Sequence, residues 1–149
     1  MIARALATLV EFLKPTEQIM TKVTLFKMYV TDQDAARRFY VEKLGFQVAE
    51  DKRLGDYRWL LVKAPDNDEF SLNLETAKTD EEKALVGRQA AGQPLFSIST
   101  DDCKRDYQEM KQRGVEFEGE PITMPYGTGV MLHDLCGNKI YLNQEPGSI

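Results

Sequence analysis

Two stretches of the chain repeat one pattern, and this duplication constrains the fold more than any single residue. In the first stretch an apolar segment ends at Thr31-Asp32, and Gly45 follows Asp32 by thirteen positions. In the second stretch a similar segment ends at Thr100-Asp101, and Gly114 follows Asp101 by the same interval. Repetition of this kind indicates one small supersecondary unit built twice, with a site expected between the copies.

The hydrophobic pattern predicts a strand, a helix and three further strands in each copy. We expect the first copy to hold strands over 23–30, from Phe46, over 57–62 and over 70–74, with a helix after the N-cap Asp32. The second copy is expected to hold strands over 95–100, 115–117, 130–133 and 139–143, with a helix over 103–113. Residues 77–93 read as an exposed connector, in which Thr79 and Glu82 have capping-box spacing.

The composition is that of an ordinary globular domain and excludes several classes of partner. The chain has 149 residues and a net charge of −5, with no block of more than two consecutive basic residues. A nucleic-acid partner is therefore not expected, and no apolar run is long enough to span a membrane. Only two cysteines occur, Cys103 and Cys136, which predicts a reducing, cytoplasmic location rather than a disulfide scaffold.

Residues 1–19 stand apart from the repeated pattern. Apolar residues fall on one helical face between Ile2 and Leu13, and Pro15 ends the run. Glu11 interrupts the apolar stretch, which argues against a secretory signal. Two interpretations stay open: an amphipathic helix that packs on the body or on a partner, and an extension that the folded domain does not need.

Three segments resemble the vicinal-oxygen-chelate superfamily, which includes glyoxalase I, extradiol dioxygenases and the fosfomycin- and bleomycin-resistance proteins. They are Val30–Tyr40, Lys43-Leu44-Gly45-Phe46 and Asp134-Leu135-Cys136-Gly137-Asn138. The resemblance covers about residues 22–145 and implies an α+β fold. Two tandem βαβββ modules would form a curved mixed-sheet cup with helices on its outer face. We expect one domain over 20–149, with modules at about 20–76 and 94–145, and a homodimer.

The same resemblance places the superfamily's metal ligands on facing strands. The corresponding positions fall on Leu25 and Asn73 in the first copy, and on Leu95 and Tyr141 in the second. Leucine has no coordinating atom, and imidazole or carboxylate ligands are the usual set for such an ion. We therefore expect no metal and no other cofactor.

Strand alternation predicts which residues line the cup. Polar and aromatic side chains share one face of the predicted strands, which suits a pocket for a small polar or aromatic molecule. The candidate ligand-binding residues are Lys27, Tyr29, Trp59, Asn73, Ser97, Ser99, Tyr126, His133 and Tyr141. The opposite faces, with Phe26, Met28, Phe70, Leu72, Leu74, Phe96, Ile98, Ile140 and Leu142, are expected to pack under helices.

Three of these features have a plain structural interpretation as well. His133, the only histidine, could shuttle protons, but a strand-end residue bonded to a neighbour is the simpler interpretation. Cys136 follows closely and is expected to be a turn residue rather than a nucleophile. The segment Tyr126-Gly127-Thr128-Gly129 is predicted to be a flexible loop at the mouth of the cup.

Two functions follow from this reasoning, and they belong to different classes. The first is a binding protein, similar to bleomycin-resistance proteins, that holds a small organic molecule without a metal. The second is a metal-dependent lyase, isomerase or dioxygenase of the glyoxalase type. The sequence leaves open whether the protein is an enzyme, and a third possibility is that the dimer surface carries the function.

Overall fold

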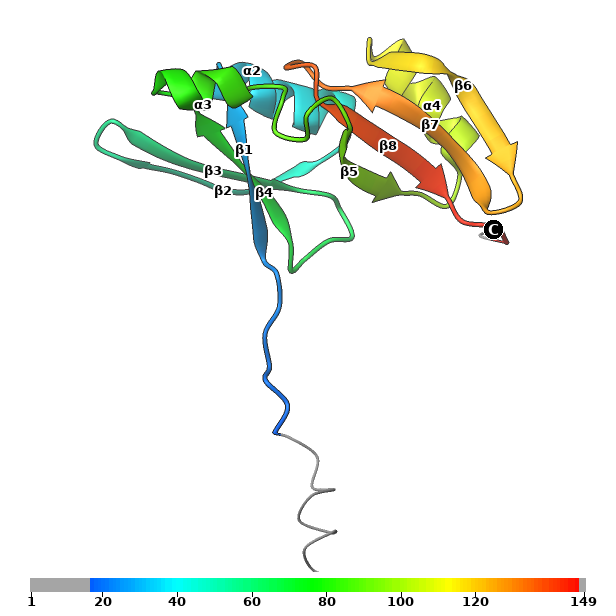
Figure 1. Cartoon of the computed structure of the whole chain (residues 1–149), viewed down its shortest axis with the longest axis horizontal. Coiled ribbons are helices and arrows are strands. Elements are labelled where there is room, and N and C mark those ends of the chain that lie inside the picture. Colours follow the sequence, from blue (N-terminus) through cyan, green and yellow to red (C-terminus); the bar gives the residue numbers. More distant parts are fainter. Residues whose placement is uncertain (1–16, 148–149) are drawn as a thin grey trace, which may run out of the picture.

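The two repeated units form two separate four-stranded sheets (Figure 1). The structure is a computed structural model that describes residues 17–147. The expectations for residues 1–16 lie outside the described part. The first module contains strands β1 (Leu25–Val30), β2 (Gln47–Leu54), β3 (Tyr57–Lys63) and β4 (Ser71–Thr76), with helix α2 (Gln33–Arg38) continuing into the π-helical turn η1 (Phe39–Lys43). The second contains β5 (Pro94–Ser99), β6 (Glu116–Met124), β7 (Gly127–His133) and β8 (Lys139–Gln144), with helix α4 (Cys103–Gln112).

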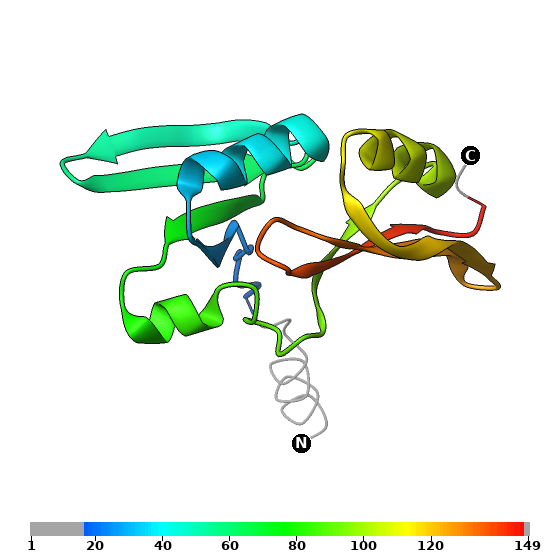
Figure 2. The ribbon, with the colours of Figure 1, turned by 90° about the horizontal axis from the view of Figure 1, so that it is seen from above.

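Both sheets have the same mixed topology, which confirms the α+β duplication. The strand orders are β1-β4-β3-β2 and β5-β8-β7-β6, and the first strand of each module runs parallel to the last. The remaining pairs are antiparallel, and the sheets do not close into a barrel. In Figure 2, α2 and α4 lie on the same side of the molecule, and the connecting helix α3 (Asp80–Leu85) lies away from them.

The core lies between each sheet and its helix, on the strand faces that the sequence predicted. Met28, Leu72, Leu74, Ile140 and Leu142 are buried, and four more apolar residues of these faces, Phe26, Phe70, Phe96 and Ile98, pack partly buried against them. Ala36, Tyr40, Tyr107 and Met110 supply the helical side. The capping box of α3 is also present, because Thr79 and Glu82 exchange hydrogen bonds.

The repeat is offset by one residue in the structure. The helical N-caps are Asp32 and Asp102, whose carboxylates accept from the amides of Ala35 and Arg105. The first helical segment therefore holds one residue more than the second before the glycine that ends it, and the wider π-helical turn η1 accommodates this residue. Gly45 and Gly114 adopt φ angles of 77° and 90°, as a left-handed helix stop requires.

One segment differs from its prediction. Residues 127–129 are not a flexible loop, because Gly127, Thr128 and Gly129 belong to β7 and pair with Met124, Thr123 and Ile122 of β6. Tyr126 lies at the tip of this hairpin, where its side chain is exposed. The two glycines suggested a loop, but glycine in a strand also marks a close approach of another group, which is the case at Gly129.

A buried polar cluster joins the two modules. The Tyr40 hydroxyl, at the end of the first helix, donates to Oδ2 of Asp134 at 2.7 Å in the turn between β7 and β8. The same carboxylate accepts from the Asn138 side chain and from the amides of Cys136 and Asn138. Burial, together with the negative charge of Asp134, raises the pKa of Tyr40 well above its usual value, so the phenol stays a donor.

Candidate functional site

The predicted lining residues of the first module lie on the sheet face that points away from α2. Lys27 and Asn73 are neighbours across the β1–β4 pair. Lys27 is exposed, Tyr29 and Trp59 are half-buried, and Asn73 is fully buried. The first three are therefore at least partly accessible to solvent, whereas Asn73 lies beneath the surface of this face.

Two aromatic side chains on this face are held by carboxylates. The Trp59 indole donates from Nε1 to Glu50 at 3.0 Å, and the Tyr57 hydroxyl donates to Glu75 at 3.0 Å. Desolvation, together with the hydrogen bond to Glu75, raises the pKa of Tyr57. Fixed rings of this kind offer a flat apolar surface at low entropic cost.

Asn73 carries a buried acceptor without a partner. Its side-chain nitrogen donates to the Leu60 carbonyl at 3.2 Å, but no hydrogen-bond donor within residues 17–147 reaches its Oδ1. A buried, unpaired acceptor costs about 1–3 kcal/mol. Strand alternation predicted the face on which Asn73 lies. No pattern in the sequence indicates that its Oδ1 lacks a hydrogen-bond partner.

The predicted residues of the second module lie on the corresponding face of the other sheet. Ser97 and Ser99 are exposed, and His133 and Tyr141 are half-buried. Tyr141 lies across β7 directly over Gly129, where a Cβ atom would be 1.9 Å from the phenol oxygen. With Tyr126 and Met131, Tyr141 lines a shallow pocket of about 240 Å³.

His133 forms a local charged cluster, as its structural interpretation predicted. Its Nε2 lies 2.8 Å from a Glu118 oxygen, and the Lys139 ammonium lies 3.3 Å from the same atom. Hydrogen bonds from His133 and Lys139 lower the pKa of Glu118. Cys136 is a turn residue, and burial raises the pKa of its thiol, so it lacks the thiolate character of a nucleophile.

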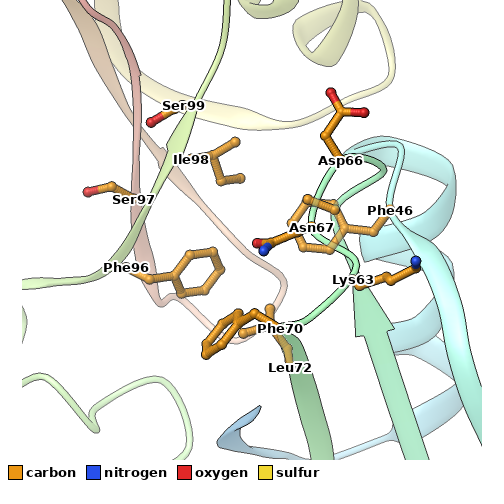
Figure 3. A pocket seen from close by; sticks show the side chains of 11 residues that line it. Phe46, Lys63, Asp66, Asn67, Phe70, Leu72, Phe96, Ser97, Ile98 and Ser99 are labelled. Carbon is orange, nitrogen blue, oxygen red and sulfur yellow. The ribbon is translucent and has the colours of Figure 1, made fainter. Parts of the chain in front are cut away.

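A further pocket lies between the modules, on the side of the sheets that carries the core (Figure 3). It has a volume of about 320 Å³, and its apolar walls are Phe46, Phe70 and Leu72 of the first module and Phe96 and Ile98 of the second. Ser97 and Ser99 also border this pocket, although in Figure 3 their side chains point away from Phe96 and Ile98.

Within a single chain, the predicted residues therefore form two groups. One group lies on the first module's sheet and the other on the corresponding face of the second module's sheet. The sequence predicted a site between the copies on the polar strand faces. The apolar walls of this pocket were missed, because Phe70, Phe96 and Ile98 were expected to be covered by helices. The available signal was their position: Phe70 directly precedes β4, and Phe96 lies near the start of β5, beyond the ends of the helices.

The residues at the superfamily's metal positions do not form a suitable ligand set. Leu25 and Leu95 have no donor atom, Asn73 is buried against Leu60, and Tyr141 lies over Gly129. Within residues 17–147 no three His, Cys, Asp or Glu side chains gather closely enough to hold an ion. In the same part of the chain no helix has the length and apolarity needed to cross a bilayer.

Comparison with known proteins identifies the family. A family model described as the glyoxalase/bleomycin resistance protein/dioxygenase superfamily matches residues 22–142. The chain belongs to this superfamily. The chain is also similar to an uncharacterized protein of Shewanella frigidimarina (strain NCIMB 400). The two are 38% identical over 113 residues, which are 74% of this chain and 84% of that protein.

Two solved structures are also similar to this chain. The crystal structure of UcmS2 matches with a TM-score of 0.75 and 30% identity, over 84% of this chain and 98% of that one. The crystal structure of TnmS3, described as an antibiotic binding protein from Streptomyces sp. CB03234, matches with a TM-score of 0.69 and 33% identity. That match covers 87% of this chain and 99% of TnmS3.

Proposed function

We propose that this protein binds a small organic molecule with aromatic rings on the strand faces opposite its helices, without a metal ion. The observation that carries the proposal is the pair Trp59 and Tyr141, one ring on each module's face. The Glu50 carboxylate accepts a hydrogen bond from Trp59, and the absence of a side chain at Gly129 leaves room for the phenol end of Tyr141. Stacking on such rings contributes about 0.5–1.5 kcal/mol beyond area burial.

The similarity to TnmS3 supports the class of ligand. Because that protein is described as antibiotic-binding, an antibiotic-like organic compound is the first class to test here. The ligand set at the metal positions supports binding rather than metal-assisted chemistry, since leucine occupies two of those positions.

A second copy of the chain would complete the binding cup in this proposal. Among the described strands, β1 pairs with β4 alone and β5 with β8 alone. Each of these two strands is therefore an edge strand of its sheet. On the outer edge of β1 the Gln89 side chain donates to the Lys27 carbonyl at 3.0 Å and accepts from the Tyr29 amide at 2.8 Å, so the chain itself occupies that part of the β1 edge. Tyr141 lines a pocket with residues of its own module alone, so the facing wall has to come from elsewhere.

Trp59, the only tryptophan, reports directly on this site. We expect bleomycin, or another member of a panel of aromatic antibiotics, to change its fluorescence saturably in the presence of EDTA. Tyr141→Ala should weaken that binding about threefold to tenfold, the loss of one aromatic contact. Leu135→Ala, at an exposed turn position, is the matched control and should leave the affinity unchanged.

The contradicting results are equally clear. A saturable response that requires an added divalent ion would favour the metal-dependent enzyme instead. A panel that leaves Trp59 fluorescence unchanged while ligands bind elsewhere would show that the strand faces are not the site.

A further inference from the structure

The pocket between the modules is not used by the proposed function and has the character of a second binding site. Its volume of about 320 Å³ lies at the lower end of the range typical for ligand pockets. Phe46 is 7% exposed and therefore fixed, while Phe70 and Phe96 are half-buried and face the pocket from different modules (Figure 3). These walls suit a flat ring system of one or two rings.

One polar side chain enters the pocket itself. In Figure 3 the Asn67 amide points toward the space beside Phe96, and the Lys63 ammonium points away from it. Lys63 is paired with Asp68 at 2.8 Å, so its charge is compensated outside the pocket. The pocket between the modules, called the ring site below, thus offers an amide but no free cation among the residues that line it.

The pocket opens into a larger cleft whose charge is negative. This cleft, of about 560 Å³, shares Phe46, Asp66 and Ile98 with the pocket. Four carboxylates, Asp66, Asp101, Asp106 and Glu109, line it against the two guanidinium groups of Arg105 and Arg113.

Asp66 is the carboxylate of this cleft that has no partner in the described part of the chain. Arg105 contacts Asp101 at 2.6 Å and Asp106 at 3.0 Å, and Arg113 lies 3.9 Å from Glu109. No ion pair within residues 17–147 involves Asp66, which stands at the rim of the ring site in Figure 3. An apolar ring site beside an unpaired carboxylate complements a ligand with a ring and a positive charge.

We propose that the inter-module pocket binds a small aromatic amine. The ring lies among Phe46, Phe70 and Phe96, and the protonated amine faces Asp66. This site is distinct from the rings that carry the proposed function, because Trp59 and Tyr141 do not line it. Ser97 and Ser99 border it, but their side chains point away from Phe96 and Ile98 in Figure 3.

A matched pair of probes tests the proposal by calorimetry on the full chain. 2-(1-Naphthyl)ethylamine and 1-naphthylacetate carry the same ring and opposite charges. We expect the amine to bind about threefold to fivefold more tightly, the size of one solvent-accessible ion pair. Asp66→Asn should abolish this preference while both probes still bind, and Glu69→Gln, whose carboxylate pairs with Lys22, should preserve it.

Substitutions of the ring site separate this proposal from the previous one. Phe96→Leu should weaken both probes equally, and circular dichroism checks that the variant is folded. Tyr141→Ala removes a ring from the strand faces and not from this pocket. It should leave the amine's affinity unchanged whether or not the strand faces bind a ligand. Equal affinity of the wild-type protein for both probes, insensitivity to Asp66→Asn and Phe96→Leu, or binding only after a dimer is dissociated by dilution would each overturn the proposal.

Discussion

At the scale of single residues, the contact between Gly129 and Tyr141 is the sharpest feature of the strand faces. A Cβ at position 129 would lie 1.9 Å from the phenol oxygen and 2.3 Å from Cζ, so the ring has to move. We expect Gly129→Ala to lower the free energy of unfolding by about 1–3 kcal/mol, the usual cost of overpacking. Urea unfolding measures this change.

A double-mutant cycle is the control for that prediction. In a Tyr141→Ala background the obstructing ring is absent, and Gly129→Ala should then cost less than about 1 kcal/mol. Equal costs in the two backgrounds would show that Tyr141 does not lie over Gly129.

At the scale of elements, the bond from Tyr40 to Asp134 links the first helix to the β7–β8 turn. Tyr40→Phe removes one donor from a buried carboxylate, and we expect a loss of about 1.5–3 kcal/mol in unfolding free energy. Tyr107→Phe in α4 is the matched control, because within residues 17–147 the Lys111 ammonium is the group that hydrogen-bonds to that buried ring's hydroxyl. Similar losses in both variants would contradict a special role for the Tyr40 bond.

Arg58 joins α2 to β2 and gives the fold a predictable acid sensitivity. Its buried guanidinium hydrogen-bonds to Asp34 and Asp51 and thereby lowers the pKa of both below the usual 3.8. Because the folded pKa lies below the unfolded one, the stabilisation is present above pH 3.8 and is lost as pH falls through the folded pKa values. Unfolding free energy should therefore fall with pH below about 4.

Arg58→Met provides the test of this cause. The variant should be less stable near neutral pH, and its unfolding free energy should depend less steeply on pH in the acidic range. Arg88→Met, at an exposed position that affects the pKa of neither carboxylate, should keep the wild-type slope. An unchanged slope in Arg58→Met would mean that other carboxylates cause the acid sensitivity.

At the scale of the whole molecule, the duplication could be predicted from the sequence because its elements depend on interactions between residues close in sequence. Helix caps at Asp32, the capping box at Thr79 and the alternating faces of β4 and β8 depend on neighbours in sequence, and all were predicted. The one-residue offset between the copies was not, because a π-helical turn has no distinctive residue pattern. A site between the copies was expected, but the apolar lining of the inter-module pocket was not, because it depends on how the two modules pack, which periodicity does not determine.

Native mass spectrometry after dialysis against EDTA tests the central claim most directly, because one spectrum reports copy number, organic ligand and metal together. After incubation with the antibiotic that responds best in the Trp59 assay, we predict a dimer that carries the organic compound and no metal ion. A dimer that gains the compound only together with a stoichiometric divalent ion, or a monomer that binds it equally well, would contradict the account.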